Sequence, residues 1–231
     1  IKAVVDMRNH KSDEEIAEIE RACTVTALMH KAAMKAARPG MKEYEMKAIV
    51  EDVARSHDMR LSFPTIATVH GEILHNHSYG NTLESGRLFL LDAGAETPMG
   101  YAGDNSSTVP VDPVYTPRQK TVYDLQQAAS NAAIAMLRPG VRFWDVHMEA
   151  SRTIAAGLKD LGIMKGDVEE AVRAGAHAMF FPTGLGHMMG LDVHDMENYG
   201  EVWVGYDGEP KSTLFGFKSL RLARPLEEGY V

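Results

Sequence analysis

The amino-acid sequence predicts an α+β fold made of two related halves, with a central antiparallel sheet and helices outside. In the first half, two helices are followed by strands, and the same order of helices returns about 100 residues later. Shifting the chain by that distance places Arg38-Pro39-Gly40 on Arg138-Pro139-Gly140 and aligns residues of both flanking helices. Because each half would bury one sheet face under its helices, the strands of both halves are expected to join one sheet.

Each element of the first half has a local signal. Ser12 and Glu15 form a capping box that opens a helix, and Arg38-Pro39-Gly40 ends it. A second helix is expected from about Glu43 to His57. The apolar run from Arg87 to Ala93 is short enough to be a buried strand.

The second half begins where Thr116 and Pro117 occupy the N-cap and first position of a helix, which Arg138-Pro139-Gly140 closes. Another helix is expected from about Trp144 to Leu161. Two unrelated helical hairpins with a common Pro-Gly turn are an alternative, but the match extends through both flanking helices and favours a duplication. A cleft between related halves is a natural place for a site.

Composition excludes several classes of function. The 231 residues are 45% apolar and 24% charged, and no apolar run has the roughly 18 residues that a membrane span requires. The net charge of −8 has no basic stripe, so nucleic acid is not an expected partner. Cys23 is the only cysteine, which favours a reducing, cytoplasmic setting. Ile1 and Val231 look like cut ends, so the chain is interpreted as a piece of a longer protein.

Two aspartates form the first candidate site. Asp92 follows four apolar residues, and a hairpin that turns near Pro98 would make Asp92 and Asp104 cross-strand neighbours. Two facing buried carboxylates require either a shared proton or divalent cations. A pair of cations about 3.5–4 Å apart would match them. The alternative is that both aspartates only mark strand ends and turns.

The Gly-rich stretch from Phe180 to Asp195 supplies candidate imidazole ligands. The alternation from Leu191 to His194 predicts a strand with Asp192 and His194 on one face. His187 and His194 are ligand types for Zn, Mn, Fe or Co, although a single buried histidine more often only bonds a backbone carbonyl.

A further candidate, His75, or alternatively His77, lies just ahead of the strand that ends in Asp92. The other histidines are interpreted as surface or packing residues: His10, His30, His57, His70, His147 and His177.

Two motifs together resemble a known family. The run from Asp92 to Asp104, and Gly184-Leu-Gly-His187-Met-Met-Gly-Leu-Asp-Val-His194-Asp195, resemble aminopeptidase P and prolidase of the pita-bread metallopeptidases. The resemblance covers essentially the whole chain. It implies that residues 1–231 are a pita-bread catalytic domain, truncated at both ends, without the amino-terminal domain and the carboxy-terminal strands that carry two glutamate ligands.

The resemblance also implies roles for particular residues. Asp92 and Asp104 would bind two divalent metal ions, with Asp104 bridging them and His187 as the imidazole ligand. A hydroxide bridging the ions would attack the peptide bond that precedes proline. His75 and His194 would act as catalytic and substrate-binding residues, and Thr183 would line the substrate site.

Manganese is the expected metal, with cobalt or zinc as alternatives. The substrates implied are peptides with proline at the second position, and the full-length protein is expected to form a homodimer.

The sequence departs from the family pattern in three places. The two glutamate ligands would lie after Val231, Thr183 stands where the proline-specific branch often has histidine, and the hairpin from Asp92 to Asp104 is one residue longer than usual. Because the two glutamate ligands would lie outside it, the 231-residue piece alone is expected to bind metal weakly and to be inactive. Alternatives are a methionine aminopeptidase-like enzyme, a non-enzymatic protein-binding module and, disfavoured by the ligand residues, a creatinase-like hydrolase.

Overall fold

The computed structural model describes residues 1–231, which form two compact units. Unit 1 comprises residues 1–11, 118–188 and 194–231, and unit 2 comprises residues 12–117 and 189–193. Helices and antiparallel sheets occur together in the chain, which confirms the predicted α+β class. No helix combines the length and the apolar composition that crossing a bilayer requires.

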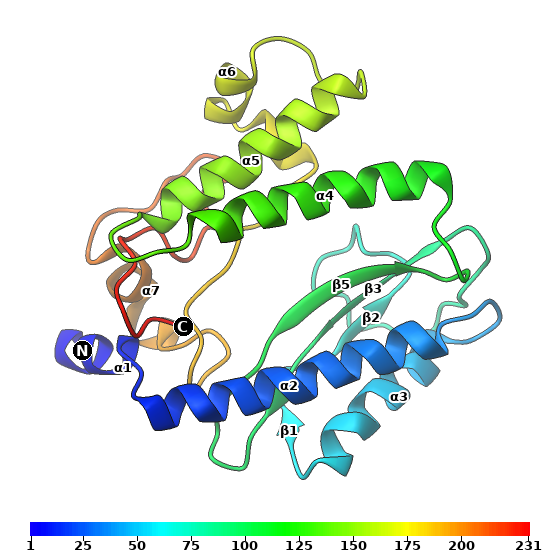
Figure 1. Cartoon of the computed structure of the whole chain (residues 1–231), viewed down its shortest axis with the longest axis horizontal. Coiled ribbons are helices and arrows are strands. Elements are labelled where there is room, and N and C mark those ends of the chain that lie inside the picture. The colour runs from blue at the N-terminus through cyan, green and yellow to red at the C-terminus, as the bar shows by residue number, and fades with distance from the viewer. The chain divides into compact units, whose positions relative to one another are not determined.

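Two long helices of unit 2, α2 (Asp13–Ala36) and α3 (Glu43–Ser56), lie side by side (Figure 1). The predicted capping box begins α2: the Glu15 N–H donates to the Ser12 hydroxyl, and the Ser12 N–H donates to the Glu15 carboxylate. Both helices fall within one or two residues of the predicted bounds.

The helices of unit 2 cover one face of a three-stranded antiparallel sheet, in the order β2 (Ile66–Thr68), β3 (Leu88–Ala93) and β5 (Asn105–Pro110). A separate pair joins β1 (Arg60–Leu61) to β4 (Ala95–Glu96). Alternate residues of β3 enter the apolar core that α2 and α3 share with the sheet, namely Phe89, Leu91 and Ala93. Asp92 therefore lies on the face of the sheet that points away from those helices.

The hairpin register differs from the prediction. Asp92 pairs with Ser106 rather than with Asp104. The Thr97 N–H bonds the Tyr101 carbonyl, so the turn is centred one residue later than Pro98. A shift of the centre by one residue moves the register by two, and since side chains alternate with period two, Asp104 stays on the same face as Asp92.

Unit 1 is helical in its regular structure. Its helices are α1 (Lys2–Asn9), α4 (Pro117–Met136), α5 (Phe143–Asp160), α6 (Val168–Arg173) and α7 (Glu197–Tyr206), with a 3₁₀ turn, η1 (Ala176–Met179). Figure 1 shows α4 beside α5, and a Cβ built on Gly157 of α5 would meet the Leu125 side chain at 2.2 Å. The two helices predicted for this half are confirmed, whereas α1, α6 and α7 were not predicted. Helix α6 has a local signal that was missed, since the Asp167 side chain caps it by accepting from the Glu170 N–H.

The backbone repeats the duplication seen in the sequence. Gly40 and Gly140 both have positive φ, 94° and 86°, and each donates its N–H to a leucine carbonyl, of Leu83 and Leu226, over 2.8 Å. An isolated antiparallel bridge follows each glycine, between Lys42 and Thr82 and between Arg142 and Pro225. These matching contacts connect each Pro-Gly turn to an equivalent downstream segment.

The predicted strand from Leu191 to His194 does not form. The Gly190 N–H donates to the Asp192 carbonyl at 3.1 Å, and the Asp195 N–H donates to the Met188 carbonyl at 3.0 Å. Because these bonds close the segment on itself, it is a looped turn, and the expectation that Asp192 and His194 share a strand face is wrong.

Candidate metal centre

The outer face of the sheet in unit 2 holds two acidic side chains in electrostatic contact. Burial, together with the negative charge of Asp104, raises the pKa of Asp92 to about 6. The Oδ1 atom of Asp92 is buried and has no hydrogen-bond partner. A buried carboxylate oxygen without a partner is costly, so this position calls for a proton or a cation.

Helix α2 fixes the backbone on both sides of these aspartates. The Ala95 N–H donates to the Thr26 hydroxyl at 2.9 Å. The His30 ring lies 2.6 Å from the Ser107 hydroxyl through Nδ1 and 3.3 Å from the Ala93 carbonyl through Nε2. His30 thus joins β3 to β5 from the core side, a role that sequence reasoning missed when it placed this residue among surface or packing histidines.

His75 lies in the loop between β2 and β3, is exposed, and has a positive φ of 54°. A positive charge on His75 acts to lower the pKa of Asp92. The His77 ring instead lies 3.4 Å from the Tyr79 hydroxyl. Of the two alternatives left open by the sequence, His75 is therefore electrostatically coupled to the aspartate pair.

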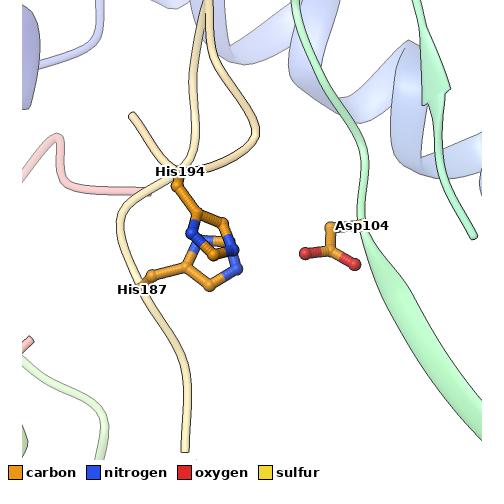
Figure 2. Close-up of side chains that lie close together, drawn as sticks. All are labelled: Asp104, His187 and His194. Atoms are coloured by element: carbon orange, nitrogen blue, oxygen red, sulfur yellow. The ribbon is translucent and has the colours of Figure 1, made fainter. Parts of the chain in front are cut away.

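In unit 1, two imidazole rings stand together. The ring centroids of His187 and His194 are 4.0 Å apart, with 44° between their planes. Figure 2 shows the two rings beside each other, and also draws the Asp104 carboxylate of unit 2. The Nδ1 atom of His187 lies 3.0 Å from the Met188 carbonyl, which fixes the ring and presents Nε2 as its ligand atom.

A carboxylate orients the second ring. Nδ1 of His194 lies 3.2 Å from Oε2 of Glu197, and the Arg221 guanidinium bonds the same oxygen. Burial acts to raise the pKa of Glu197, but the bond to His194 and the charge of Arg221 hold it below its usual value. Neither Glu197 nor Arg221 was predicted, because no local pattern shows that residues 24 positions apart meet.

Thr183 is exposed in the segment between η1 and His187. The neighbouring Gly184 packs tightly against backbone, since a Cβ at this glycine would lie 2.7 Å from the Leu220 Cα. This close approach fixes the path of the chain that leads from Thr183 to His187.

The aspartate pair of unit 2 fits a divalent cation. A cation would satisfy the orphaned Asp92 oxygen and relieve the repulsion between Asp92 and Asp104. Carboxylate oxygen together with imidazole nitrogen is a ligand set for Mn, Co or Zn.

The chain is similar to proteins of known function. The model of metallopeptidase family M24 matches residues 17–231. An Xaa-Pro aminopeptidase of Escherichia coli is 39% identical over 86% of this chain and 45% of its own length. A human Xaa-Pro dipeptidase is 35% identical over 99% of this chain and 46% of its own.

A solved structure agrees with these matches. The zinc-substituted E. coli aminopeptidase P in complex with product superposes with a TM-score of 0.85 at 37% identity, over 99% of this chain and 48% of the solved one. This likeness confirms the predicted pita-bread fold. The chain spans about half the length of the relatives it matches.

Proposed function

The chain belongs to metallopeptidase family M24, and from this premise we propose that it is the greater part of the catalytic domain of an Xaa-Pro peptidase. The proposed reaction is hydrolysis of the peptide bond that precedes proline. The observation that carries the proposal is the buried Asp92 beside Asp104, with an oxygen that lacks a partner and a pKa raised to about 6. A structural aspartate pair with no cation would be a costly arrangement.

In this proposal Asp92, Asp104 and His187 hold two divalent ions. Within unit 2, Gly190 accepts a hydrogen bond of 2.9 Å from the N–H of Ala102, which joins residues 189–193 to the segment that leads into Asp104.

The bound ions would supply an activated water and the positive charge that stabilises the tetrahedral oxyanion. A hydroxide that bridges both ions is implied by the family resemblance and stays a prediction. The protein's own residues bind and orient the peptide. His194, whose Nδ1–H donates to the Glu197 carboxylate, would hold the substrate through Nε2, which in the neutral ring is a hydrogen-bond acceptor. His75 would face the scissile bond, and Thr183 would line the proline pocket.

The metal is proposed to be manganese, with cobalt and zinc as alternatives. The E. coli aminopeptidase P has been solved in a zinc-substituted form, which keeps zinc among the metals to test. A homodimer and a cytoplasmic location are further parts of the proposal.

Three peptides separate the candidate activities. The full-length protein, loaded in turn with Mn²⁺, Co²⁺ or Zn²⁺, is assayed on an Xaa-Pro dipeptide, a longer Xaa-Pro peptide and a Met-Ala peptide. Cleavage of the dipeptide alone identifies a dipeptidase, and cleavage of the longer peptide an aminopeptidase. Cleavage of only the Met-Ala peptide would show that the enzyme is of the methionine aminopeptidase kind.

A pair of variants tests the metal ligands. Asp104→Ala should lose bound metal and lower kcat/KM by more than about 100-fold, since even residues outside the ligand shell cost 10–100-fold. Asp124→Ala, which removes an exposed carboxylate paired with Lys120 on α4, should change neither. A full-length protein that holds no divalent ion, with Asp104→Ala indistinguishable from wild type, would favour the non-enzymatic binding module instead.

A further inference from the structure

A buried ion cluster lies directly beside the histidine loop of unit 1. Asp195 is 1% exposed, and its Oδ1 lies 2.6 Å from an Arg8 guanidinium nitrogen. Its Oδ2 lies 3.1 Å from Nζ of Lys11, whose side chain is 1% exposed. Both cations come from the chain's first eleven residues, more than 180 positions away from their partner.

The carboxylate of this cluster belongs to the residue next to His194. The Asp195 N–H also donates to the Met188 carbonyl, the residue next to His187, over 3.0 Å. Asp195 therefore closes the loop by bonding Met188, and these two residues directly follow His194 and His187 in the sequence. Moving Asp195 would displace both imidazoles together.

The amino-terminal anchor of the cluster is itself fixed. Arg8 lies in the last turn of α1, and the Lys11 N–H donates to the Gly229 carbonyl at 2.8 Å. Two cations on one buried carboxylate satisfy both of its oxygens, and losing the carboxylate would take a negative charge away from the buried Lys11 ammonium. The cluster is therefore fixed by helix α1, by the hydrogen bond from Lys11 to Gly229 and by the hydrogen bond from Asp195 to Met188.

We propose that Arg8, Lys11 and Asp195 are positioning residues that set the spacing and orientation of His187 and His194. This inference rests on the proposed function, in which those histidines serve a metal centre and its substrate. Partners outside a ligand shell commonly determine metal affinity because they fix the orientation of the ligands.

The test compares metal binding and ring environment in the full-length protein. Asp195→Asn keeps the size of the side chain but removes its charge, and should raise the Kd for Mn²⁺ by about 10-fold or more in calorimetry. In metal-free protein at fixed pH, it should also shift the ¹⁵N resonances of the His187 and His194 rings. Arg8→Met should also raise the Kd for Mn²⁺ and shift the ring resonances. Arg8→Lys, which keeps the positive charge, should leave the Kd and the resonances close to those of wild type.

A matched control separates positioning from stability alone. Glu43→Gln alters a fully buried carboxylate of unit 2 that contacts neither histidine, so it should lower the thermal midpoint while leaving the Kd and the ring resonances unchanged. The inference is overturned if Asp195→Asn and Arg8→Met also lower only the midpoint. If wild type binds no Mn²⁺, the proposed function fails, and the ring resonances still decide whether the cluster positions the histidines.

Discussion

Two glycines of unit 2 face each other across the hairpin that carries the aspartate pair. A Cβ on Gly94 would lie 1.8 Å from the Gly103 carbonyl oxygen, and a Cβ on Gly103 would lie 2.6 Å from the Thr26 hydroxyl of α2. Only glycine permits this approach, and it allows α2 to reach the backbone around Asp92 and Asp104.

Gly94→Ala should therefore lower the free energy of unfolding by about 3 kcal/mol, because the obstructing atom is backbone and cannot rotate away. It should also weaken Mn²⁺ binding, since the hairpin that holds both aspartates must move. Gly80→Ala is the control: nothing lies within 4 Å of its Cβ position, so its effect should stay within about 0.5 kcal/mol. Urea unfolding of both variants measures the difference, and equal stability would contradict the proposed steric role.

At this scale, the sequence could identify residues whose signal is local. Asp92 stands out because a charged residue follows an apolar strand, and His187 and His194 because they share a Gly-rich segment. His30 could not be identified, since its partners Ser107 and Ala93 are brought to it only by the packing of α2 on the sheet. The predicted pairing of Asp92 with Asp104 was wrong, because the composition of the hairpin does not distinguish a turn centred at Pro98 from one centred one residue later.

The amino-terminal end of α3 is tied to the rest of unit 2 through one buried carboxylate. Glu43, in the first turn of α3, accepts hydrogen bonds from the Thr68 hydroxyl and the Val69 N–H through Oε1. Through Oε2 it accepts from the backbone N–H and the side-chain amide of Asn81. One side chain thus connects a helix, the end of β2 and the loop that precedes β3.

Glu43→Gln should lower the free energy of unfolding by about 2 kcal/mol, because hydrogen bonds to a charged group are strong and the new amide nitrogen would face the Asn81 donors without accepting from them. Chemical denaturation measures this loss. The exposed Glu84→Gln serves as the comparison and should change stability by less than about 0.5 kcal/mol. Similar effects of the two substitutions would show that the Glu43 contacts contribute little.

Among the elements, helix ends were predictable where capping chemistry is written in adjacent residues. The Ser12 capping box and the Pro-Gly stops define α2, α4 and α5 to within a few residues. The helix α7 could not be predicted, because it begins and ends at left-handed residues, Met196 and Asp207, and contains Gly200 at φ 136°. Its irregular backbone is stabilised by tertiary packing, which includes Val204 in the core of unit 1.

For the molecule as a whole, the repeat was the most informative feature of the sequence. Shared residue identities at a spacing of 100 predicted the equivalent Pro-Gly turns, and the positive φ of Gly40 and Gly140 confirms that equivalence. The inner environment of unit 1 was not predictable in the same way, since its buried polar residues come from segments that lie far apart in the sequence.

The clearest of these is a pair of buried histidines. His147 of α5 and His177 of η1 are both 0% exposed, and none of their four ring nitrogens has a partner at good hydrogen-bond geometry, although the backbone of Gly216 and of Val172 acts to raise their respective pKa values. Their neighbours are aromatic, with the Phe181 ring 5.2 Å from His147 and the Phe217 ring 5.1 Å from His177. Burial lowers the pKa of His147 to about 4, with His177 contributing, and burial also lowers the pKa of His177.

Acid should therefore destabilise the protein through this pair. In the unfolded chain a histidine takes up a proton below about pH 6.5, whereas folded His147 remains neutral down to about pH 4. Between these values the unfolded state binds more protons, so the free energy of unfolding falls as the pH decreases, by about 3 kcal/mol from His147 once the pH reaches 4. Denaturant unfolding of metal-free protein from pH 7.5 to 4 measures this loss.

The comparison that isolates the effect is His147→Leu, which removes the titrating ring while filling the same apolar site. Asp92 acts in the opposite direction, because its pKa of about 6 lets the folded state bind a proton first as the pH falls. Only the difference between the wild-type and variant curves therefore reports on His147. That difference should grow steadily below pH 6.5. Parallel curves for wild type and His147→Leu would mean that the buried pair takes up protons in the folded state as readily as in the unfolded chain.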